Sequence, residues 1–146
     1  MIRNALKTDI NTLLEIEKLC FTTDRLTRRN FLYLLSDKSP SVNLVYEEDE
    51  KVGAYCTLLL NSKTLLARLY SIAVHPNLKG KNIGTILMNE IEKIAAKNNC
   101  KAIRLEVKDG NTTAVKLYER MGYKHIGYIS DYYEDHIRAL RYEKSL

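Results

Sequence analysis

Apolar residues recur along the chain with two different periods, one typical of helices and the other of strands. Between Ile10 and Leu19 they are spaced as on one face of a helix, and Ile83, Leu87 and Ile91 repeat this spacing in a longer segment. The helices that the pattern predicts begin after Thr8 or Asp9, after Thr27, near Ile83 and after Asn111.

Strands are predicted where apolar and polar residues alternate, or where short apolar runs end at turn residues. In the segment AIRLEV, Ile103, Leu105 and Val107 are expected on one face and Glu106 on the other. An acidic turn at residues 48–50 joins two apolar runs as a hairpin. The predicted strands are MIRNAL, SVNLVYEE, KVGAYCTLLL, TLLARLYSIAV, AIRLEV, YKHIGYIS and IRALRYEK. This order of elements predicts a single α+β domain over residues 1–146, with helices on the faces of a mixed sheet.

The composition is that of an ordinary globular protein, with 45% hydrophobic and 28% charged residues. The formal net charge of +5 suits a polyanionic ligand. The positive residues are spread along the chain and form no basic tail, which argues against nucleic-acid binding. Cys20, Cys56 and Cys100 are far apart and odd in number, so we expect reduced thiols in a cytoplasmic protein. No signal segment, no apolar run of about 20 residues and no metal-binding spacing of His and Cys is present. We therefore expect neither a membrane anchor nor a metal site.

The segment HPNLKGKNIG, residues 75–84, joins a predicted strand to a predicted helix. Pro76 ends the strand, and the helix start that follows offers unpaired N–H groups and a positive dipole end, which suit a phosphate. Gly80 and Gly84 let the backbone approach a ligand closely, and Asn82 tolerates left-handed φ. The spacing matches neither a P-loop nor a dinucleotide fingerprint. Taken alone, the segment favours a polar loop before an ordinary amphipathic helix.

The wider stretch SIAVHPNLKGKNIGTILMNEIEK resembles the acyl-CoA-binding core of the GNAT superfamily of N-acetyltransferases. In that core, R/Q-x-x-G-x-G/A follows a strand that ends in hydrophobic-A-V-x-P. Lys79 stands where the family usually has Arg or Gln, and Asn82 where it usually has Gly. A second stretch, RLEVKDGNTTAVKLYERMGYKHIG, resembles the family block L-x-V-x-x-x-N-x-x-A-x-x-L-Y-x-x-x-G-F/Y. The two stretches follow the family's order and spacing, and together they cover about half of the chain.

The resemblance implies a GNAT fold, in which a mostly antiparallel sheet splays apart at a parallel strand pair and acetyl-CoA lies in the gap. It also implies that a backbone amide of the splayed strand polarises the thioester carbonyl. The residues that the resemblance implies for coenzyme binding are Ile72, Ala73, Val74, Lys79, Gly80, Lys81, Asn82, Ile83, Gly84, Thr85 and Asn111. Asn111 fits the role of a plain helix cap equally well.

Within the superfamily, LEVKDGNTTAVKLYERMGY is most similar to the ribosomal-protein-alanine (RimI-type) N-terminal acetyltransferases. This similarity implies that Glu106 is the general base and Tyr118 the general acid. The residue types suit the chemistry, because a carboxylate can deprotonate an α-amine with pKa about 8 and a phenol can protonate a thiolate. Taken singly, Glu106 would be a solvated strand residue and Tyr118 a core tyrosine. Their assignment therefore depends on the motif.

Two further segments are expected on the acceptor side. SDYYEDH, residues 130–136, resembles the paired-tyrosine hairpin of N-terminal acetyltransferases, and its Glu134 and Asp135 could attract a cationic amine. The alternative is a polar hairpin with surface tyrosines. CFTTDRLTRRNF, residues 20–31, falls where the family covers the acceptor site. The candidates for substrate binding are Phe21, Arg25, Tyr132 and Tyr133.

Together these observations predict a cytoplasmic enzyme that transfers an acetyl group from acetyl-CoA to an amine without a metal ion. We expect the acceptor to be the N-terminal α-amine of a protein or peptide, and the enzyme to be a monomer or homodimer that acts without nucleic acid or membrane. Two alternatives stay open. A closed, acidic acceptor pocket would favour a small amine such as a polyamine, amino acid or antibiotic. A non-catalytic acyl-CoA-binding module would be favoured if Glu106 and Tyr118 pointed away from the thioester.

Overall fold

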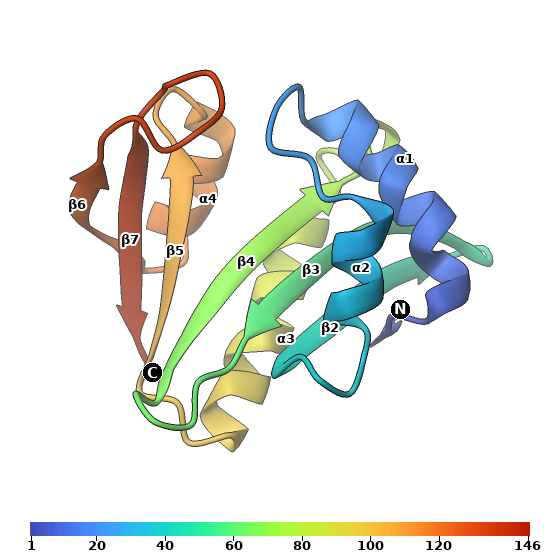
Figure 1. The fold of residues 1–146 in the computed structure, drawn as a ribbon, viewed down its shortest axis with the longest axis horizontal. Helices are drawn as coiled ribbons and strands as arrows, with labels where there is room; N and C mark the ends of the chain where they lie inside the picture. Colours follow the sequence, from blue (N-terminus) through green and yellow to red (C-terminus); the bar gives the residue numbers. More distant parts are fainter.

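A seven-stranded sheet in the order β1-β2-β3-β4-β5-β7-β6 lies at the centre of the computed structural model, which describes residues 1–146 (Figure 1). The strands are β1 (Ile2–Asn4), β2 (Ser41–Glu48), β3 (Lys51–Leu59), β4 (Leu66–Val74), β5 (Ala102–Lys108), β6 (Lys124–Ile129) and β7 (Ala139–Ser145). The helices are α1 (Ile10–Cys20), α2 (Arg28–Leu34), α3 (Ile83–Lys97) and α4 (Thr112–Arg120), with 3-10 helices at Lys7–Asp9 and Pro76–Leu78. The predicted order of helices and strands is confirmed. None of the helices is long and apolar enough to cross a membrane.

Strand pairing is antiparallel everywhere except between β4 and β5, which run parallel. The mixed, mostly antiparallel sheet expected for a GNAT fold is therefore confirmed. The predicted hairpin between β2 and β3 turns at Asp49 and Glu50, whose φ angles are 52° and 62°. Two consecutive residues with positive φ match the twist of the flanking strands and allow this tight turn.

The two faces of the sheet are covered by different helices. On the α1 face, α1 and α2 pack around Phe31, Tyr55 and Ala73. On the α3 face, α3 and α4 cover the larger core, to which Leu87 and Ile91 belong. In Figure 1, α1 and α2 lie in front of β2, β3 and β4, whereas α3 lies behind them. A ligand that passes between two strands can therefore reach both helical layers.

Side-chain caps fix the starts of α2 and α4. The Asn30 amide donates to Thr27 Oγ1 at 3.1 Å, and the Thr27 amide donates to Asn30 Oδ1 at 2.9 Å, which forms a capping box. Asn111 Oδ1 accepts a hydrogen bond from the Ala114 amide at 3.3 Å. Both caps lie where the sequence predicted them.

The start of α1 differs from the prediction of a cap at Thr8 or Asp9. Asp9 precedes the helix, but its carboxylate makes no cap hydrogen bond. It pairs instead with Arg3 of β1 at 2.8 Å and accepts a hydrogen bond from the Leu6 amide at 2.7 Å. An ion pair that ties β1 to the helix start therefore takes the place of the expected cap.

A shift of register in β4 places two polar side chains on the same face. The pairing of β4 with β3 skips Tyr70. Leu69 belongs to the core on the α3 face, and Ala73 belongs to the core on the α1 face. Because side chains alternate along a strand, Arg68 and Ser71 both project toward the α1 face. The skipped residue, Tyr70, thus brings Ser71 to the same face as Arg68, beside the end of the parallel pair.

Candidate active site

β4 and β5 are paired only over their first residues. The parallel partners run from Leu66 and Ala102 to Leu69 and Leu105 and end there. The two strands diverge beyond this point (Figure 1), and a cleft of about 1280 Å³ opens between them. The structure therefore contains the expected splayed pair. One edge of β4 is left without a partner strand and can pair with a ligand.

The loop before α3 leaves a run of backbone amides without protein acceptors. The last hydrogen bond within the loop is donated by the Lys79 amide, and the next is donated by the Ile86 amide. The amides of Gly80–Thr85 lie between these bonds. Gly80 and Asn82 adopt φ angles of 85° and 60°, which turn the chain into the helix. Free amides at the N-terminus of a helix suit a phosphate or pyrophosphate.

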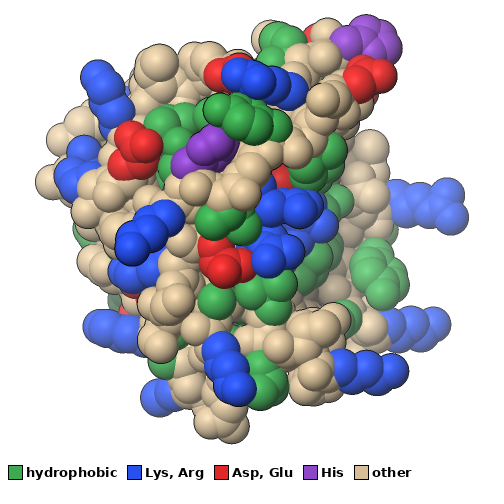
Figure 2. All heavy atoms as spheres, turned by 90° about the vertical axis from the view of Figure 1, so that its left-hand side faces the viewer, with side chains coloured by type: hydrophobic (Ala, Val, Ile, Leu, Met, Phe, Trp, Pro, Cys, Tyr) green, Lys and Arg blue, Asp and Glu red, His purple; other side chains and the backbone are tan.

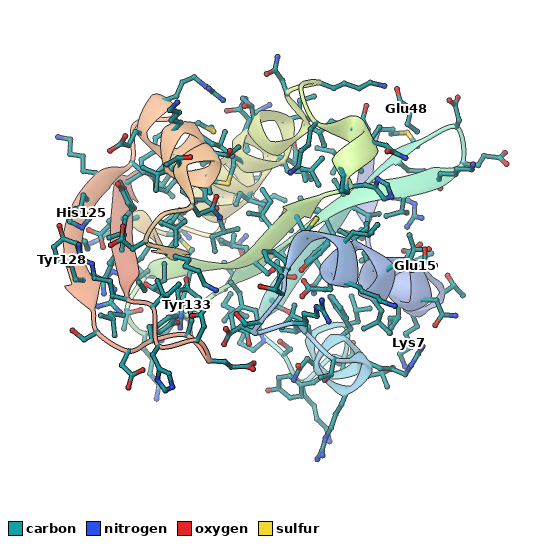
Figure 3. All side chains as sticks on the ribbon, turned by 90° about the horizontal axis from the view of Figure 1, so that it is seen from above. Lys7, Glu15, Glu48, His125, Tyr128 and Tyr133 are labelled. Carbon is teal, nitrogen blue, oxygen red and sulfur yellow. The ribbon has the colours of Figure 1, made fainter.

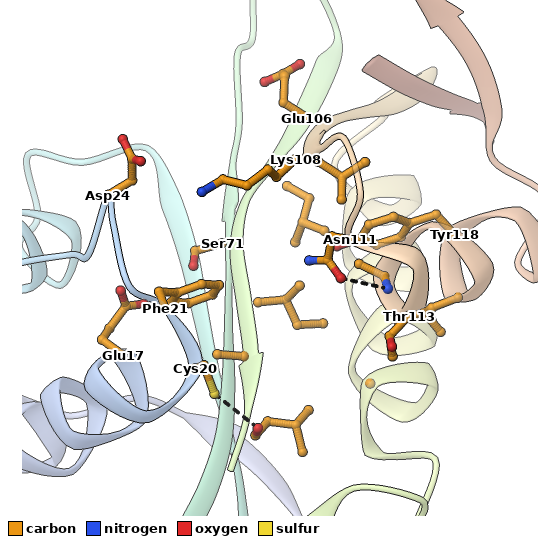
Figure 4. Close-up of a pocket in the computed structure, with 18 of the residues that line it drawn as sticks. Glu17, Cys20, Phe21, Asp24, Ser71, Glu106, Lys108, Asn111, Thr113 and Tyr118 are labelled. Atoms are coloured by element: carbon orange, nitrogen blue, oxygen red, sulfur yellow. Dashed lines mark hydrogen bonds between the residues drawn. The ribbon is translucent and has the colours of Figure 1, made fainter. Parts of the chain in front are cut away.

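Most of the residues predicted to bind coenzyme line the cleft. They are Ile72, Ala73, Val74, Lys79, Gly80, Asn82, Ile83, Gly84, Thr85 and Asn111. Lys81 does not line it, and its ammonium group lies 3.8 Å from a carboxylate oxygen of Glu48. A Cβ atom at Gly84 would lie 3.2 Å from Leu117 Cδ2, so this glycine lets α3 and α4 approach closely. Asn111 both caps α4 and lines the cleft (Figure 4), which is compatible with each of its expected roles.

Two basic residues of α4, Lys116 and Arg120, also line the cleft. They are four positions apart and therefore lie on the same side of the helix. They were not predicted from the sequence, because only the apolar stripe of α4 gives a clear periodic signal. With Lys79 they supply positive charge for phosphate groups. No three His, Cys, Asp or Glu side chains come together as metal ligands anywhere in the structure.

Glu106 and Tyr118 line the same cleft from opposite faces of the sheet. Leu105 and Val107 belong to the core on the α3 face, so the side chain of Glu106 projects toward the α1 face. Tyr118 belongs to the core on the α3 face. The structure thus brings both predicted catalytic residues to the cleft (Figure 4), one on each side of the sheet.

The Glu106 carboxylate is held between two arginines. Its side chain is 4% exposed, with Oε1 2.5 Å from Arg68 Nη2 and Oε2 3.1 Å from Arg141 Nε. Arg68 Nη2 also donates to the hydroxyl of Tyr132 at 2.7 Å. The Arg68 contact lacks hydrogen-bond geometry, and both Glu106 Oε1 and Arg68 Nε are buried without a partner. Such atoms keep hydrogen-bonding capacity that a polar ligand can use.

The environment of Tyr118 keeps its phenol protonated. Burial raises the pKa of Tyr118 well above its usual value, and the nearby Tyr133 adds to the effect. The ring packs edge-on against Tyr123, with 6.0 Å between the ring centroids. The Tyr118 hydroxyl makes no hydrogen bond within the protein, so it can donate to a bound group. A neutral donor of this kind suits the protonation of a leaving thiolate.

Two loops meet over the α1 side of the cleft, one between α1 and α2 and the other between β6 and β7. The amide of Asp24 donates to Glu134 Oε1 at 3.0 Å, and the amide of Glu134 donates to Asp24 Oδ2 at 3.1 Å. Lys108, at the end of β5, donates to Thr23 Oγ1 at 3.0 Å and to Asp135 Oδ2 at 2.7 Å. The two loops are therefore joined both directly and through Lys108. We call this set of contacts the entrance bridge.

Three of the four predicted acceptor-side residues line the cleft, namely Phe21, Tyr132 and Tyr133. Tyr133 lies where the β6–β7 loop faces α1 (Figure 3). Arg25 does not line the cleft, because its guanidinium folds back and donates to the Phe21 carbonyl at 2.6 Å. Lys108 was not predicted as a site residue, since a lysine at an alternating strand position has the pattern of a solvated residue.

A second buried glutamate, Glu17, lines the cleft from α1 (Figure 4). It is 2% exposed, and its carboxylate accepts hydrogen bonds from the Tyr55 hydroxyl and, at 2.8 Å, from the Leu26 amide. The Tyr55 hydroxyl lies 2.7 Å from Ser71 Oγ. Burial raises the pKa of Glu17, and the Tyr55 hydrogen bond opposes this effect. In the sequence, Glu17 lies between Ile16 and Leu19 of the predicted first helix, and a charged residue at a buried position of this helix is the signal that could have identified it.

Comparison with known proteins agrees with this geometry. The sequence model of the Acetyltransferase (GNAT) family matches residues 10–123. A Bacillus subtilis (strain 168) protein named as a candidate [ribosomal protein bS18]-alanine N-acetyltransferase is 28% identical over 134 residues, which cover 92% of this chain and 87% of that protein. The crystal structure of Ard1 from Thermoplasma volcanium superposes with a TM-score of 0.90 at 24% identity and covers 100% of this chain and 97% of that one. The ribosomal-protein-S18-alanine N-acetyltransferase from Escherichia coli superposes with a TM-score of 0.88 at 21% identity, covering 99% and 92%. The chain belongs to the GNAT family of acetyltransferases.

Proposed function

We propose that this acetyltransferase uses acetyl-CoA to acetylate the N-terminal α-amine of a protein or peptide. The observation that carries the proposal is the cleft between β4 and β5, which passes through the split sheet. The free backbone amides before α3 lie at one end of this cleft, and Glu106 lies at the other end beside the entrance lined by tyrosines. The name of the Bacillus subtilis relative supports a ribosomal protein with N-terminal alanine as the class of acceptor.

The cleft suits acetyl-CoA in its chemistry. In this proposal the free edge of β4 at residues 72–74 pairs with the pantetheine arm, and the amides of Gly80–Thr85 hold the pyrophosphate. Lys79, Lys116 and Arg120 add positive charge along the same cleft. The coenzyme would thus occupy the α3 side and bring its acetyl group to the point where β4 and β5 separate.

Glu106 is the proposed general base and Tyr118 the proposed general acid. Glu106 projects toward the α1 face, where the acceptor nitrogen attacks, and Arg68 and Arg141 balance its charge. Tyr118 faces the α3 side, where a neutral phenol can protonate the departing thiolate of CoA. The base thus lies on the side from which the amine would attack the acetyl carbon, and the acid lies on the side from which the CoA thiolate would leave.

A small amine is the second candidate acceptor, and the entrance bridge favours it. The bridge joins the two loops over the α1 side of the cleft and narrows the access that a peptide needs. It also gathers Asp24, Glu134 and Asp135, whose carboxylates attract a polyamine more than a peptide backbone. These three residues make the acceptor class a question for experiment.

Two other functions are less well supported. A non-catalytic acyl-CoA-binding role would need Glu106 and Tyr118 to point away from the cleft, and both line it. Nucleic-acid binding would need a contiguous basic face. On the side formed by β6 and β7, the basic side chains are separated by acidic and apolar ones (Figure 2).

The decisive experiment is a mass-spectrometric acceptor screen with acetyl-CoA. The screen would contain peptides that differ in their first residue, alanine included, together with polyamines, amino acids and aminoglycosides. A lysine-containing peptide with a blocked N-terminus is the matched control. We expect a mass increase of one acetyl group on free N-termini only. Efficient acetylation of polyamines without any peptide product would replace the proposed acceptor by the small amine.

A further inference from the structure

We propose that Glu17, acting through Tyr55 and Ser71, takes up the proton that the acceptor's ammonium group must lose before the amine attacks. The inference rests on the proposed acetyl transfer to an amine. It does not depend on whether that amine belongs to a peptide or to a small molecule, since both arrive at neutral pH mainly as ammonium ions.

The path begins at Ser71, which lies on the α1 face of β4 just beyond the last residue paired with β5. Ser71 Oγ is 2.7 Å from the Tyr55 hydroxyl, and that hydroxyl is hydrogen-bonded to the Glu17 carboxylate. Tyr55 is 2% exposed and Glu17 is also 2% exposed, so bulk water does not compete along this path. Two hydroxyl groups therefore connect the site of attack to a buried carboxylate in α1.

The charges around the two glutamates of the cleft differ. Glu106 is paired with Arg68 and Arg141, whereas none of the ion pairs in the structure includes Glu17. A carboxylate without a cationic partner has more to gain from a proton. Of the two, Glu17 is thus the better suited to take up the proton of an incoming ammonium ion, and Glu106 remains the proposed base for the second proton, which the nitrogen loses once it has attacked the acetyl carbon.

Few charged or titratable groups face Glu17. They are Tyr55 from β3, Cys20 from α1 and Arg25 from the following loop. Burial is the largest influence on Glu17 and raises its pKa, whereas the hydrogen bonds from Tyr55 and the Leu26 amide, and the charge of Arg25, oppose this increase. A higher pKa makes the carboxylate a stronger base for the same transfer.

The transfer is balanced without any further reagent. One N–H bond of the ammonium breaks and its proton goes to Ser71 Oγ, while the Ser71 proton passes to Tyr55 and the Tyr55 proton to Glu17. The nitrogen keeps the electron pair, which forms the new bond to the acetyl carbon. Glu17 ends as a neutral acid and returns its proton to solvent along the same path after the product leaves. Only Ser71 touches the amine, and Tyr55 and Glu17 act through it.

A purely structural role for Glu17 is the competing explanation. Its carboxylate also accepts the Leu26 amide at 2.8 Å and so anchors the loop between α1 and α2. Glu17→Gln separates the two roles, because glutamine keeps the volume and an acceptor oxygen but cannot take up a proton. A structural defect would lower activity by the same factor at every pH, whereas a lost proton acceptor matters only where the amine is protonated.

The test is the dependence of kcat/KM on pH between about 6.5 and 9, with an α-amine acceptor of pKa about 8. Wild-type protein should change little over this range. Glu17→Gln should depend on the neutral amine alone, so it should match wild type near pH 9 and fall about tenfold below it at pH 7. Tyr55→Phe and Ser71→Ala should behave like Glu17→Gln. If Glu17→Gln does not fold, Tyr55→Phe keeps the buried ring and provides the same comparison.

Glu15→Gln is the matched control. It makes the same charge change on the same helix at an exposed position (Figure 3), so its profile should follow wild type. Glu106→Gln should lower kcat/KM by a similar factor at every pH. An equal loss for Glu17→Gln at pH 7 and pH 9, or no loss at either, overturns the proposal.

A second readout needs no activity. In protein labelled with 13C at glutamate carboxyls, Glu17 should titrate above the usual range of a glutamate, and Tyr55→Phe should shift the Glu17 midpoint. An unchanged midpoint in Tyr55→Phe would contradict the proposed link between the two residues. If only polyamines prove to be acceptors, the proposed peptide acceptor is wrong. The pH comparison can then be repeated with a polyamine, whose own pKa sets the expected range. Failure of the proposed acceptor and failure of the proposed role of Glu17 are thus distinguishable.

Discussion

Asp24 and Glu134 hold each other across the entrance of the cleft, because the backbone amide of each donates to the carboxylate of the other, at 3.0 and 3.1 Å. The loop with Asp24 lies beside the half of the sheet that contains β4, and the loop with Glu134 belongs to the half that contains β5. Both are exposed, so their bonds contribute little to global stability. Their consequence is local: they fix the distance between the two loops that flank the proposed entrance for the acceptor.

Replacing Asp24 by alanine should therefore free the β6–β7 loop while the melting temperature stays close to that of wild type. The variant removes the acceptor of the Glu134 amide, so hydrogen exchange at this amide should become faster. Asp131→Ala is the control, because Asp131 pairs with His136 within the same loop and does not reach the other one. Unchanged exchange at Glu134 in Asp24→Ala would show that the bridge does not hold the loop.

Glu106→Gln should lower kcat by about a hundredfold, which is typical of the loss of a general base. The amide keeps the volume of the side chain but not its negative charge, so the affinity for CoA should stay nearly unchanged. Glu143→Gln is a suitable control, since Glu143 pairs with Arg104 at 2.9 Å next to the same strand but does not line the cleft. Wild-type turnover by Glu106→Gln at pH 7, measured with saturating acetyl-CoA, would rule out Glu106 as the base.

Tyr118→Phe and Tyr123→Phe should have opposite effects. The Tyr118 hydroxyl has no protein partner, so its removal should lower turnover and leave the free energy of unfolding almost unchanged. The Tyr123 hydroxyl donates to Glu92 at 2.9 Å, so its loss should cost about 1 kcal/mol of stability and spare turnover. Because burial raises the pKa of Tyr118, wild-type activity should not decline through its ionisation up to about pH 10. A decline with a tyrosine-like pKa below that pH would contradict the assignment.

Gly84→Val should weaken CoA binding in calorimetry. A Cβ atom at this position would lie 3.2 Å from Leu117 Cδ2, and the branched side chain would push the start of α3 away from α4. Asn82→Gly should bind CoA at least as well as wild type, since Asn82 has a φ of 60° that glycine adopts freely. Gly127→Ala, in β6 with no atom within 4 Å of the added Cβ, is the control. Equal affinities of wild type and Gly84→Val would refute the placement of the pyrophosphate.

Local features of the fold were predictable from the sequence because they depend on neighbouring residues. The cap at Thr27, the cap at Asn111 and the turn at residues 48–50 each need only a few adjacent positions. The alternation of β5 likewise predicted that Glu106 faces away from the core of the α3 face.

The surroundings of Glu106 could not be predicted in this way. Arg141 meets it because the two residues are direct partners between β5 and β7. Arg68 meets it because β4 lies beside β5 and skips Tyr70 in its pairing with β3. Strand register over such distances in sequence depends on the whole sheet, and a single skipped residue reverses the direction of the side chains that follow.

The placement of Glu106 and Tyr118 on opposite faces of the sheet also has a consequence for kinetic order. In the proposed arrangement, acetyl-CoA and the amine enter the cleft from opposite faces of the sheet and do not block each other, so either can bind first and both are present when the acetyl group moves. The enzyme should therefore follow sequential kinetics through a ternary complex, with intersecting lines in double-reciprocal plots. Because neither product has to pass the other, the acetylated amine should also be able to leave while CoA is still bound.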